Sequence, residues 1–558
     1  MNLIQVMKMK KTLYIYIGIA ALALTACNDI LDQAPDNRTD IDTPSKVKML
    51  MTSAYPEATP AMLCELSSDN LIDNNVAVAA THLSPYYDFQ SEAFKWENIV
   101  NYSSNADDTP YQVWNEYYLG ISVCNHAIEA IDKMLEKDPT LATQLLPYKG
   151  EALVARAWMH FSLVNVFAMA YRNDELSQAD LGIPYVTEPE TVVRVDYDRP
   201  SVTEVYRLIE QDIIEGLPLI NDSYYDLPKF HFNKNAALAF AARFYLYKRD
   251  YDKVLEYANK VLGANPADML RKWGTINQNS IDAALKWYND EQASCNFLLQ
   301  TTYSLMDRML SACRFMYNDD KAHEQMALAV TQWGTGPCWS GALPCYQGNV
   351  YVWGRGQDYG GWLFRVYEYF EYTDKIAGIG YVHMVYQPFS AEETLLCRAE
   401  ANFFKGDYDA CLADLKAWAV SKQCSTELTE ARINSFYTES RTGGYVYPLN
   451  TELMSPDFVV PAERKAMLDC ILHFRRIETV FEGLRWFDIK RYGIEIKHYY
   501  RDPGEESVHV DSLLWNDPRR ALQIPQDVIA AGLIPNDRTT FTQSSSTSTA
   551  LGSPTPMQ

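Results

Sequence analysis

Two segments of the chain repeat one arrangement, and this repeat constrains the fold more than any other feature of the sequence. Residues 237–266 and residues 393–419 each contain an Ala-rich run, a break of a few residues, an Asp-Tyr-Asp triplet and a second amphipathic run. The triplets, at residues 250–252 and 407–409, occupy equivalent places. Because small side chains let two antiparallel helices approach closely, each segment predicts a pair of packed helices.

Helix pairs with a repeat length near 34 residues are typical of tetratricopeptide repeats. The copies are irregularly spaced, which argues against one continuous solenoid. Other segments are also helical in pattern: residues 111–134 and 150–171 are rich in apolar residues at helical spacing, and Ser201 with Glu204 forms a capping box. We therefore predict a mostly α fold with little β structure, built as a tetratricopeptide-like helix-pair scaffold that carries long irregular loops.

The amino terminus has the pattern of a secretion signal. Lys8, Lys10 and Lys11 precede an apolar run of about a dozen residues, 13–24, which is too short to span a bilayer. The run ends in Leu24-Thr25-Ala26-Cys27, which looks like a bacterial lipobox. Acylation of Cys27, for example with palmitate, would anchor the protein because each buried methylene contributes about 0.8 kcal/mol. The alternative is an ordinary signal peptide followed by a chance cysteine.

Composition along the chain predicts five parts. Residues 1–26 form the signal peptide, and residues 27–45 form a polar, acidic tether. Residues 46–230 form an amino-terminal helical half, and residues 231–540 form a carboxyl-terminal half with an aromatic loop region at 267–390. Residues 541–558 form a Ser/Thr-rich tail.

Charge and cysteine content exclude several kinds of site. The formal net charge of −23 argues against nucleic acid as a partner, because phosphate would be repelled. No C-x-x-C motif is present, so neither a zinc ribbon nor a thioredoxin-type site is supported. Most cysteines lie in helical patterns and resemble small core residues. Cys338 and Cys345, in a Gly/Pro-rich stretch, are the one pair that we consider for a disulfide bond.

Enzyme motifs are absent or incomplete. His323-Glu324 lacks the second histidine of a zinc protease motif, and Gly354-x-Gly356 lacks the third glycine of a dinucleotide loop. Neither a G-x-S-x-G elbow nor a phosphate-binding loop is present. A pair of glycosidase carboxylates stays open, since only their separation in space is diagnostic. We predict no catalysis, no cofactor and no metal.

Aromatic residues are concentrated in the middle of the chain, where residues 273–362 hold six of the twelve tryptophans. Sugar rings stack their C–H faces on aromatic rings, and their hydroxyl groups need polar partners at the ring edge. Three segments offer this mixture, although each aromatic residue can also belong to the core. The candidate ligand-binding residues are Asp69, Asn70, Tyr86, Tyr87, Trp96, Trp273, Trp287, Tyr288, Trp333, Trp339, Trp353, Asp358, Tyr359 and Trp362.

The stretch 474–493, FRRIETVFEGLRWFDIKRYG, has an apolar stripe through Phe474, Ile477, Phe481 and Leu484, which predicts one helix. Opposite charges three residues apart predict ion pairs along it: Arg475/Glu478, Glu482/Arg485 and Arg485/Asp488. Gly483 indicates that another backbone packs closely there. Such charges can belong to a catalytic site or to a structural helix. We favour the structural role and predict that Glu482 and Arg485 tie this segment to the scaffold through partly buried pairs.

These motifs together resemble the SusD/RagB family of outer-membrane nutrient-binding lipoproteins of Bacteroidetes. The resemblance covers nearly all of the mature chain. It departs from the family pattern near the end, where Asp537-Arg538 and a longer Ser/Thr tail stand. The matching motifs are Cys27 with Asp29-Ile30-Leu31-Asp32, Gly182-Ile183-Pro184, Arg199-Pro200-Ser201-Val202, Arg398-Ala399-Glu400-Ala401, the stretch 474–493, Leu522-Gln523-Ile524-Pro525 and Pro535-Asn536.

The resemblance implies four helix pairs, no catalysis, and capture of glycans or sometimes peptides at the cell surface, beside a SusC-like TonB-dependent transporter. Ligand-binding residues vary within this family, so none is transferred by motif. We predict a lipid-anchored, outward-facing outer-membrane protein that binds a glycan and delivers it to the transporter. The alternatives are a surface scaffold that binds no ligand, and a peptide-binding member of the family. Exposed aromatic side chains would favour a binding protein, whereas buried ones would favour the scaffold.

Overall fold

The two repeated segments form packed helix pairs in the computed structural model. The first pair is α10 (Lys234–Lys248) with α11 (Tyr251–Leu262), and the second is α14 (Ala391–Phe404) with α15 (Tyr408–Ser421). In each pair the first Asp of the Asp-Tyr-Asp triplet caps the second helix, because the side chain of Asp250 accepts a hydrogen bond from the Lys253 N–H and that of Asp407 from the Ala410 N–H. Each triplet thus marks the start of the second helix in its pair.

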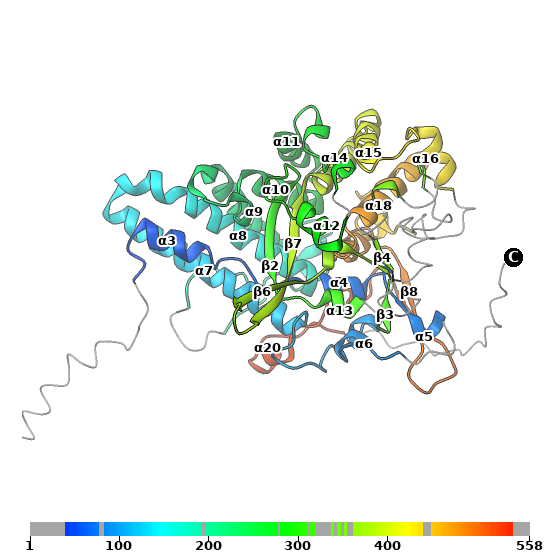
Figure 1. The fold of residues 1–558 in the computed structure, drawn as a ribbon, viewed down its shortest axis with the longest axis horizontal. Coiled ribbons are helices and arrows are strands. Elements are labelled where there is room, and N and C mark those ends of the chain that lie inside the picture. Colours follow the sequence, from blue (N-terminus) through cyan, green and yellow to red (C-terminus); the bar gives the residue numbers. More distant parts are fainter. Residues whose placement is uncertain are drawn as a thin grey trace, which may run out of the picture. The chain divides into compact units, whose positions relative to one another are not determined.

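The two pairs also pack on each other, although they are far apart in the chain. The Tyr251 ring stacks on Phe404 with centroids 4.8 Å apart, and Lys405 forms an ion pair with Asp252 at 2.7 Å. Figure 1 shows α10, α11, α14 and α15 gathered in one region. The predicted mostly α, helix-pair fold is confirmed.

The structure describes residues 40–77, 83–190, 196–276, 279–310, 313–317, 336–339, 343–346, 351–353, 361–438 and 448–538. The chain divides into a unit of residues 1–43 and a unit of residues 44–558, and the second unit contains every element described below. The signal peptide, Cys27 and the tail 541–558 lie outside the described residues. The division between halves at residue 230 stays a sequence-based prediction.

The remaining helices and strands have the following bounds. The helices are α3 (Pro44–Met51), α4 (Ala61–Ser67), α5 (Asn74–Ala77), α6 (Phe89–Phe94), α7 (Pro110–Lys137), α8 (Ala142–Phe167), α9 (Val202–Gly216), α12 (Ile281–Tyr288), α13 (Met306–Leu310), α16 (Glu430–Phe436), α17 (Thr451–Met454), α18 (Lys465–Glu478), α19 (Leu484–Arg491) and α20 (Gln526–Ala530). The strands are β1 (Ile72–Asp73), β2 (Asn296–Thr302), β3 (Phe315–Met316), β4 (Tyr351–Trp353), β5 (Gly361–Leu363), β6 (Tyr369–Asp374), β7 (Ile379–Ser390), β8 (Ile496–Tyr500) and β9 (His509–Leu513). None of the helices in the described part of the chain has both the length and the apolar character needed to cross a membrane.

Helix α8 packs against α7 on one side and against α9 on another, and it crosses α9 at two glycines. A Cβ atom on Gly150 would lie 2.7 Å from the Gly216 carbonyl oxygen, so a side chain is excluded there. Arg156 on α8 and Asp212 on α9 form a two-point ion pair at 2.8 and 2.7 Å. The predicted N-cap is confirmed, because the Ser201 hydroxyl accepts a hydrogen bond from the Glu204 N–H.

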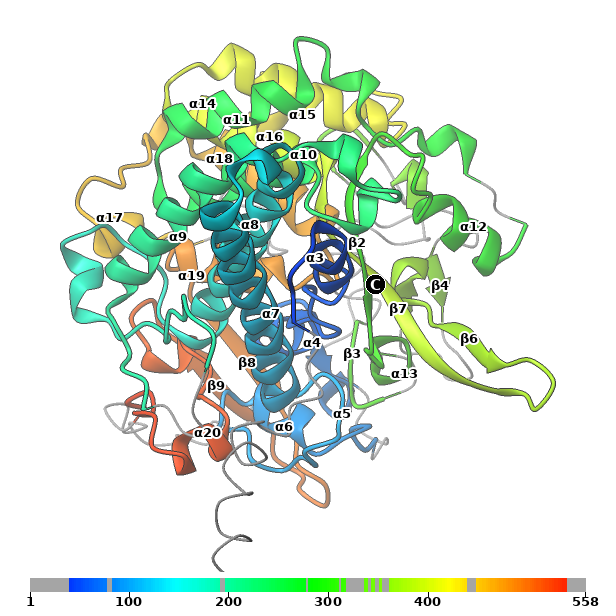
Figure 2. The same cartoon turned by 90° about the vertical axis from the view of Figure 1, so that its left-hand side faces the viewer.

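The strands form small antiparallel sheets. The largest of them has three strands in the order β2-β7-β6. Strands β6 and β7 continue past β2 as a hairpin that projects from the rest of the structure in Figure 2. Register places Tyr369 opposite His383 and Glu371 opposite Tyr381. The pairs β1–β3, β4–β5 and β8–β9 complete the sheets of the described residues.

The stretch 474–493 forms two helices, so the predicted single helix is wrong. Helix α18 ends at Glu478 and α19 begins at Leu484, because Phe481 and Gly483 have φ values of 65° and 78°. The close packing predicted at Gly483 is confirmed, since a Cβ there would lie 2.9 Å from the Cys64 Cβ. The turn lets α19 pack against α4.

The charged side chains of this stretch have other partners than the predicted ones, some within the stretch and some far away in the chain, so the predicted pairs are wrong as well. Their partners, with the N–O distances, are Arg475 with Asp488 at 3.0 Å, Glu478 with Lys422 at 2.6 Å, Glu482 with Arg365 at 2.9 Å and Arg485 with Asp69 at 2.8 Å. The turn between α18 and α19 breaks the spacing that would have aligned the predicted pairs. The prediction that Glu482 and Arg485 tie this segment to the scaffold is confirmed.

Candidate functional site

Asp69 and Asn70 connect the end of α4 to the α18–α19 framework. The Asp69 carboxylate accepts hydrogen bonds from Nε and Nη2 of Arg485 at 2.8 and 2.9 Å. Asn70 is fully buried, donates to Glu65 at 2.8 Å and accepts from Nε of Arg476 at 2.9 Å. Burial raises the pKa of Glu65 to about 7. The contacts of Asp69 and Asn70 in this structure are therefore structural.

Trp96 is only 3% exposed, and its ring is covered. Its indole N–H donates to the Ser67 carbonyl oxygen at 2.8 Å, and its ring stacks on His498 at a centroid distance of 4.1 Å. Arg538 donates to the Trp96 carbonyl oxygen at 2.8 Å. These contacts leave no ring face open to a ligand in this structure.

The second predicted segment is partly buried as well. Trp273 and Tyr288 are 1% and 5% exposed, and the Arg271 guanidinium lies 3.9 Å from the centre of the Tyr288 ring. Trp287 is half-buried, and its indole N–H donates to the Thr275 hydroxyl at 3.1 Å. Of these three aromatic residues, Trp287 offers the most accessible ring.

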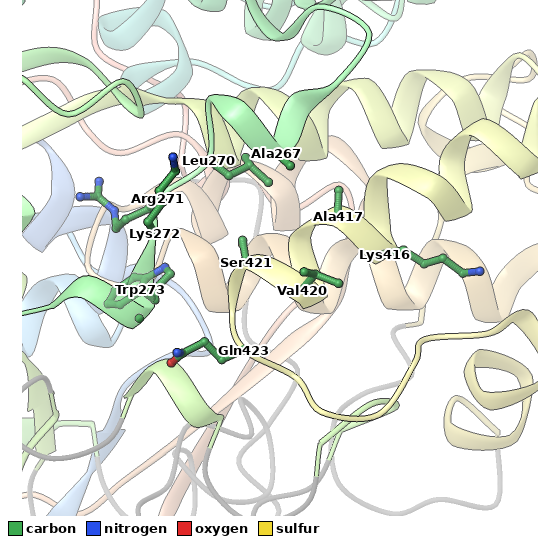
Figure 3. Close-up of a pocket in the computed structure, with 11 residues that line it drawn as sticks. Ala267, Leu270, Arg271, Lys272, Trp273, Lys416, Ala417, Val420, Ser421 and Gln423 are labelled. Atoms are coloured by element: carbon green, nitrogen blue, oxygen red, sulfur yellow. The ribbon is translucent and has the colours of Figure 1, made fainter.

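A pocket of about 410 Å³ lies between residues 267–274 and the end of α15 (Figure 3). Ala267, Leu270, Ala417 and Val420 supply an aliphatic lining. The ring of Trp273 contributes little open surface, because this residue is almost fully buried. Lys272, Lys416, Ser421 and Gln423 also line the pocket, so it offers polar groups but no open aromatic face on which a sugar ring could stack.

The third predicted segment is described only in part. Trp333, Asp358 and Tyr359 lie outside the described residues. Strand pairing places Trp353 opposite Gly361 and Val352 opposite Trp362, and the side chains of these residues also lie outside the described part. Trp339 is 7% exposed and packs against Phe474 and His473 at centroid distances of 5.9 and 6.0 Å.

Tyr86 is the most exposed of the predicted residues that the structure describes. Its side chain is 42% exposed and makes an edge contact with the Tyr87 ring at 4.8 Å. Arg308 on α13 forms an ion pair with Glu368 at 2.8 Å, and Glu368 together with the nearby Tyr86 raises the pKa of the Arg308 guanidinium. Glu368 immediately precedes β6, so the Tyr86 loop is linked to the base of the projecting hairpin.

The base of the hairpin adds further aromatic residues. Tyr303, just after β2, lies 5.5 Å from the Tyr381 ring, and Tyr381 lies 6.0 Å from His383. We call Tyr86, Tyr87, Tyr303, Tyr381 and Arg308 the tyrosine surface. Tyr303, Tyr381 and Arg308 were not predicted from the sequence, because they lie just after β2, in β7 and on α13, outside the three aromatic-rich segments. The alternating pattern of residues 379–386, IGYVHMVY, was the available signal for a strand.

Metal-ligand groups are scarce in the part of the chain that the structure describes. There, Asp502, Glu505 and His509 form the one group of three with ligand atoms within 4.8 Å of one another. Asp502 already forms ion pairs with Lys95 at 2.6 Å and Arg314 at 3.4 Å. These cations oppose the binding of a further cation at Asp502.

The cysteines in the described residues are all free thiols, so the Cys338–Cys345 disulfide considered from the sequence is wrong. Both residues are buried. The neighbouring Cys424 thiol and burial raise the pKa of the Cys338 thiol.

The helix pairs and the α18–α19 framework have the fold of SusD superfamily proteins. The fold matches a solved SusD superfamily protein from Bacteroides thetaiotaomicron with a TM-score of 0.55 and 18% identity, over 89% of this chain and 100% of the other. A SusD superfamily protein from Bacteroides vulgatus matches with a TM-score of 0.55 and 19% identity, over 89% of this chain and 98% of the other. A laminarin-binding SusD-like protein matches with a TM-score of 0.52 and 16% identity, over 88% of this chain and 98% of the other.

Sequence comparisons agree with the fold. A SusD-like family model, described as starch-binding and associating with the outer membrane, matches residues 29–246. The SusD-like protein P38 of Formosa agariphila is 24% identical over 507 residues, which cover 84% of this chain and 88% of that protein. The chain is thus similar to SusD-like proteins in sequence and has their fold, in agreement with the resemblance predicted from the sequence.

Proposed function

We propose that this protein binds a glycan at the tyrosine surface. The observation that carries the proposal is the exposed ring of Tyr86, which stands beside Tyr87 and Arg308. The matching family is described as starch-binding, and one protein of the same fold binds laminarin, which supports a glycan as the ligand. Among the described candidates, Tyr86 and Tyr87 remain binding residues in this proposal, and Trp287 is a secondary one.

The chemistry of the tyrosine surface suits sugars. A tyrosine ring offers a flat apolar face for the C–H groups of a pyranose, and its hydroxyl group both donates and accepts hydrogen bonds. The Arg308 guanidinium donates several hydrogen bonds in a planar fork and is 41% exposed. Carboxylates nearby, such as Glu371, accept hydrogen bonds from sugar hydroxyl groups.

In the same proposal, lipid on Cys27 holds the protein on the outer membrane, facing outward, and a SusC-like TonB-dependent transporter receives the glycan. The description of the family as associating with the outer membrane supports the location. The basic, apolar and Leu-Thr-Ala-Cys pattern of residues 8–27 supports the anchor. The tryptophans of the third predicted segment, Trp333, Trp353 and Trp362, remain proposed contacts for the glycan.

A scaffold that binds no ligand is the second candidate function. The burial of Trp96, Trp273 and Trp339 favours it, because these side chains serve packing and offer no ring to a sugar. The two candidates differ in what the exposed tyrosines do. A scaffold needs no particular side chain at Tyr86 or Tyr381, whereas a glycan site needs both rings.

Calorimetry of glycan binding by the mature chain and its variants tests the proposal. We expect that Tyr86→Ala and Tyr381→Ala each weaken binding by about 1–2 kcal/mol, roughly tenfold, because each removes a stacking face. Tyr499→Ala on β8 is the matched control, since Tyr499 is 46% exposed and belongs to another hairpin. Equal affinity in all three variants would exclude the tyrosine surface. No binding across a broad polysaccharide panel would favour the scaffold.

A further inference from the structure

Tyr303 and Arg308 of the tyrosine surface belong to one short segment of the chain. Strand β2 ends at Thr302 and α13 begins at Met306, so residues 303–305 form the turn between these two elements. The Tyr303 ring meets Tyr381 from this turn, and Arg308 lies on α13 just after it. The positions of both side chains therefore depend on the contacts that hold the turn in place.

Hydrogen bonds to distant parts of the chain hold the backbone of this turn. The Tyr303 N–H donates to the Glu57 carbonyl oxygen at 2.8 Å. The Leu305 N–H donates to Oδ2 of Asp108 at 2.8 Å. The Tyr303 carbonyl oxygen accepts from Nε2 of Gln112 at 3.3 Å. One side chain just before α7 and one in the first turn of α7 thus hold both ends of the turn.

Asp108 and Gln112 also fix each other. The Asp108 N–H donates to Oε1 of Gln112 at 2.6 Å, and Nε2 of Gln112 donates to Oδ1 of Asp107 at 2.9 Å. A glutamine side chain has one carbonyl group that accepts and one amide group that donates, and both groups of Gln112 are engaged. The contacts between the turn and α7 are therefore one connected network, in which each bond supports the others.

Asp108 takes its place in this network at a cost to stability. It is 1% exposed, and its φ value of 60° lies in the region that favours glycine. Burial raises the pKa of its carboxyl group to about 7, although the hydrogen bond from the Leu305 N–H opposes this shift. Backbone strain of this kind is concentrated at ligand-binding and switch sites. The strain at Asp108 therefore favours a role in the adjacent tyrosine surface over a role in packing alone.

We propose that Asp108 is a positioning residue for the glycan site, because it fixes the turn 303–305 and thereby Tyr303 and Arg308. The inference rests on the proposed function, since it assigns this role at the same tyrosine surface. Asp108 is buried, so it acts through the turn and makes no contact with the glycan. A surface whose groups are fixed before the ligand arrives loses less conformational entropy on binding, which strengthens the affinity. Gln112 supports Asp108 in this role.

Hydrogen exchange of the mature chain without ligand tests the positioning. Asp108→Gly removes the acceptor and suits a φ of 60°, so we expect the amides of residues 303–310 to exchange several-fold faster. Asp108→Asn keeps an oxygen that accepts from the Leu305 N–H, and we expect exchange at the wild-type rate. Asp138→Gly is the matched control, because the exposed Asp138 accepts from the Thr140 N–H at 3.0 Å at the other end of α7. Wild-type exchange in Asp108→Gly, or equally fast exchange in Asp108→Asn, would overturn the proposal.

Calorimetric titration with laminarin and with soluble starch gives the second readout. We expect Asp108→Gly to weaken the binding of the glycan that the wild type binds several-fold, because the turn must then be ordered on binding. Asp108→Asn is expected to restore the wild-type affinity, and Asp138→Gly is expected to retain it. A purely structural role would leave the affinity of the folded Asp108→Gly protein unchanged. That result would overturn Asp108 as a positioning residue, even if the turn exchanges faster.

Gln112→Met provides the same test if Asp108→Gly does not fold. Methionine has about the length of glutamine but lacks its amide group, so the bonds to Asp108 and to the Tyr303 carbonyl oxygen are lost. We expect faster exchange of residues 303–310 and weaker glycan binding, as in Asp108→Gly. Wild-type exchange and affinity in Gln112→Met would overturn the network as the support of the turn.

The two readouts separate this inference from the proposed function. If the wild type binds no glycan of a broad panel, the proposed function fails, and the exchange rates still decide whether Asp108 fixes the turn. If the wild type binds a glycan and the exchange rates of Asp108→Gly and wild type are equal, the positioning role fails and the glycan site remains.

Discussion

Asp69 and Arg485 are separated by 416 positions in the chain and meet in a two-point ion pair. Arg485 is 1% exposed, so its charge depends on partners inside the protein. Asp69 also lies 3.4 Å from Arg476, and one carboxylate therefore serves two buried cations. At the scale of the residue, Asp69, which the sequence suggests as a ligand contact, serves as an internal counter-ion for two arginines.

Replacing Asp69 with alanine is expected to destabilise the protein by about 3–5 kcal/mol, because the buried Arg485 loses its counter-charge. Asp252→Ala is the matched control, since Asp252 and Lys405 form an exposed pair with 77% and 42% exposed side chains. Such surface pairs contribute about 0–1 kcal/mol. Chemical denaturation measures the free energy of unfolding of both variants. If Asp69→Ala keeps wild-type stability and loses glycan binding, Asp69 is a ligand residue and the structural role is wrong.

Two kinds of contact hold the helix pairs of this protein together. An arginine and an aspartate bridge the two helices through two hydrogen bonds, as Arg156 with Asp212 in α8–α9 and Arg398 with Asp414 in α14–α15. Glycine permits the closest approach, as at Gly150, where α8 meets the Gly216 carbonyl. At the scale of the element, close contact and a buried ion pair together align the helices.

Gly150→Ala is expected to destabilise the protein by about 1–3 kcal/mol, because the new methyl group would stand 2.7 Å from the Gly216 oxygen and from the Leu219 Cβ. Helix propensity alone favours alanine over glycine by about 1 kcal/mol, so a loss of stability would isolate the packing effect. Gln144→Ala on the exposed face of the same helix serves as the control. A Gly150→Ala protein that unfolds at higher denaturant than wild type would show that α8 and α9 separate easily.

At the scale of the whole molecule, negative charge dominates, with a formal net charge of −23. The same sign is found at the tyrosine surface, where burial and then the carboxylates of Glu57, Glu371 and Glu116 raise the pKa of Tyr303. A glycan that approaches Tyr303 and Tyr381 therefore meets carboxylates. Neutral polysaccharides avoid the repulsion that a uronate-rich polysaccharide would encounter.

We expect neutral glucans to bind more tightly than uronate-rich polysaccharides at low salt. Added salt is expected to narrow the difference, because it screens exposed charges beyond about 10 Å at 0.1 M. Glu371→Gln is expected to improve uronate binding several-fold and to affect glucan binding much less, because Glu371 is 54% exposed beside Tyr381 and an amide oxygen still accepts a hydrogen bond without the negative charge. Titration with each polysaccharide at two ionic strengths measures these affinities. Tighter binding of the uronate-rich polysaccharide than of the glucan by the wild type would contradict the prediction.

Local patterns in the sequence predicted the helical scaffold well. The Asp-Tyr-Asp triplets marked two helix starts, Ser201 marked a third, and Gly483 marked a close approach of two backbones. Each of these signals depends on neighbours within a few residues or on the absence of a side chain. The candidate site was harder to predict, because the exposure of an aromatic ring depends on what packs over it from other parts of the chain.

The stretch 474–493 shows which properties of this protein the sequence determines and which only the tertiary structure decides. By itself the sequence identified it as a framework segment, typical of SusD-like proteins, in which Glu482 and Arg485 act as ties. Only the tertiary structure decided which partners they take, Arg365 and Asp69, and where the helix breaks. It also decided that Trp96 is covered by His498 while Tyr86 stays open. The physical reason is that helix signals act over a few residues, whereas ion pairing and burial join residues hundreds of positions apart.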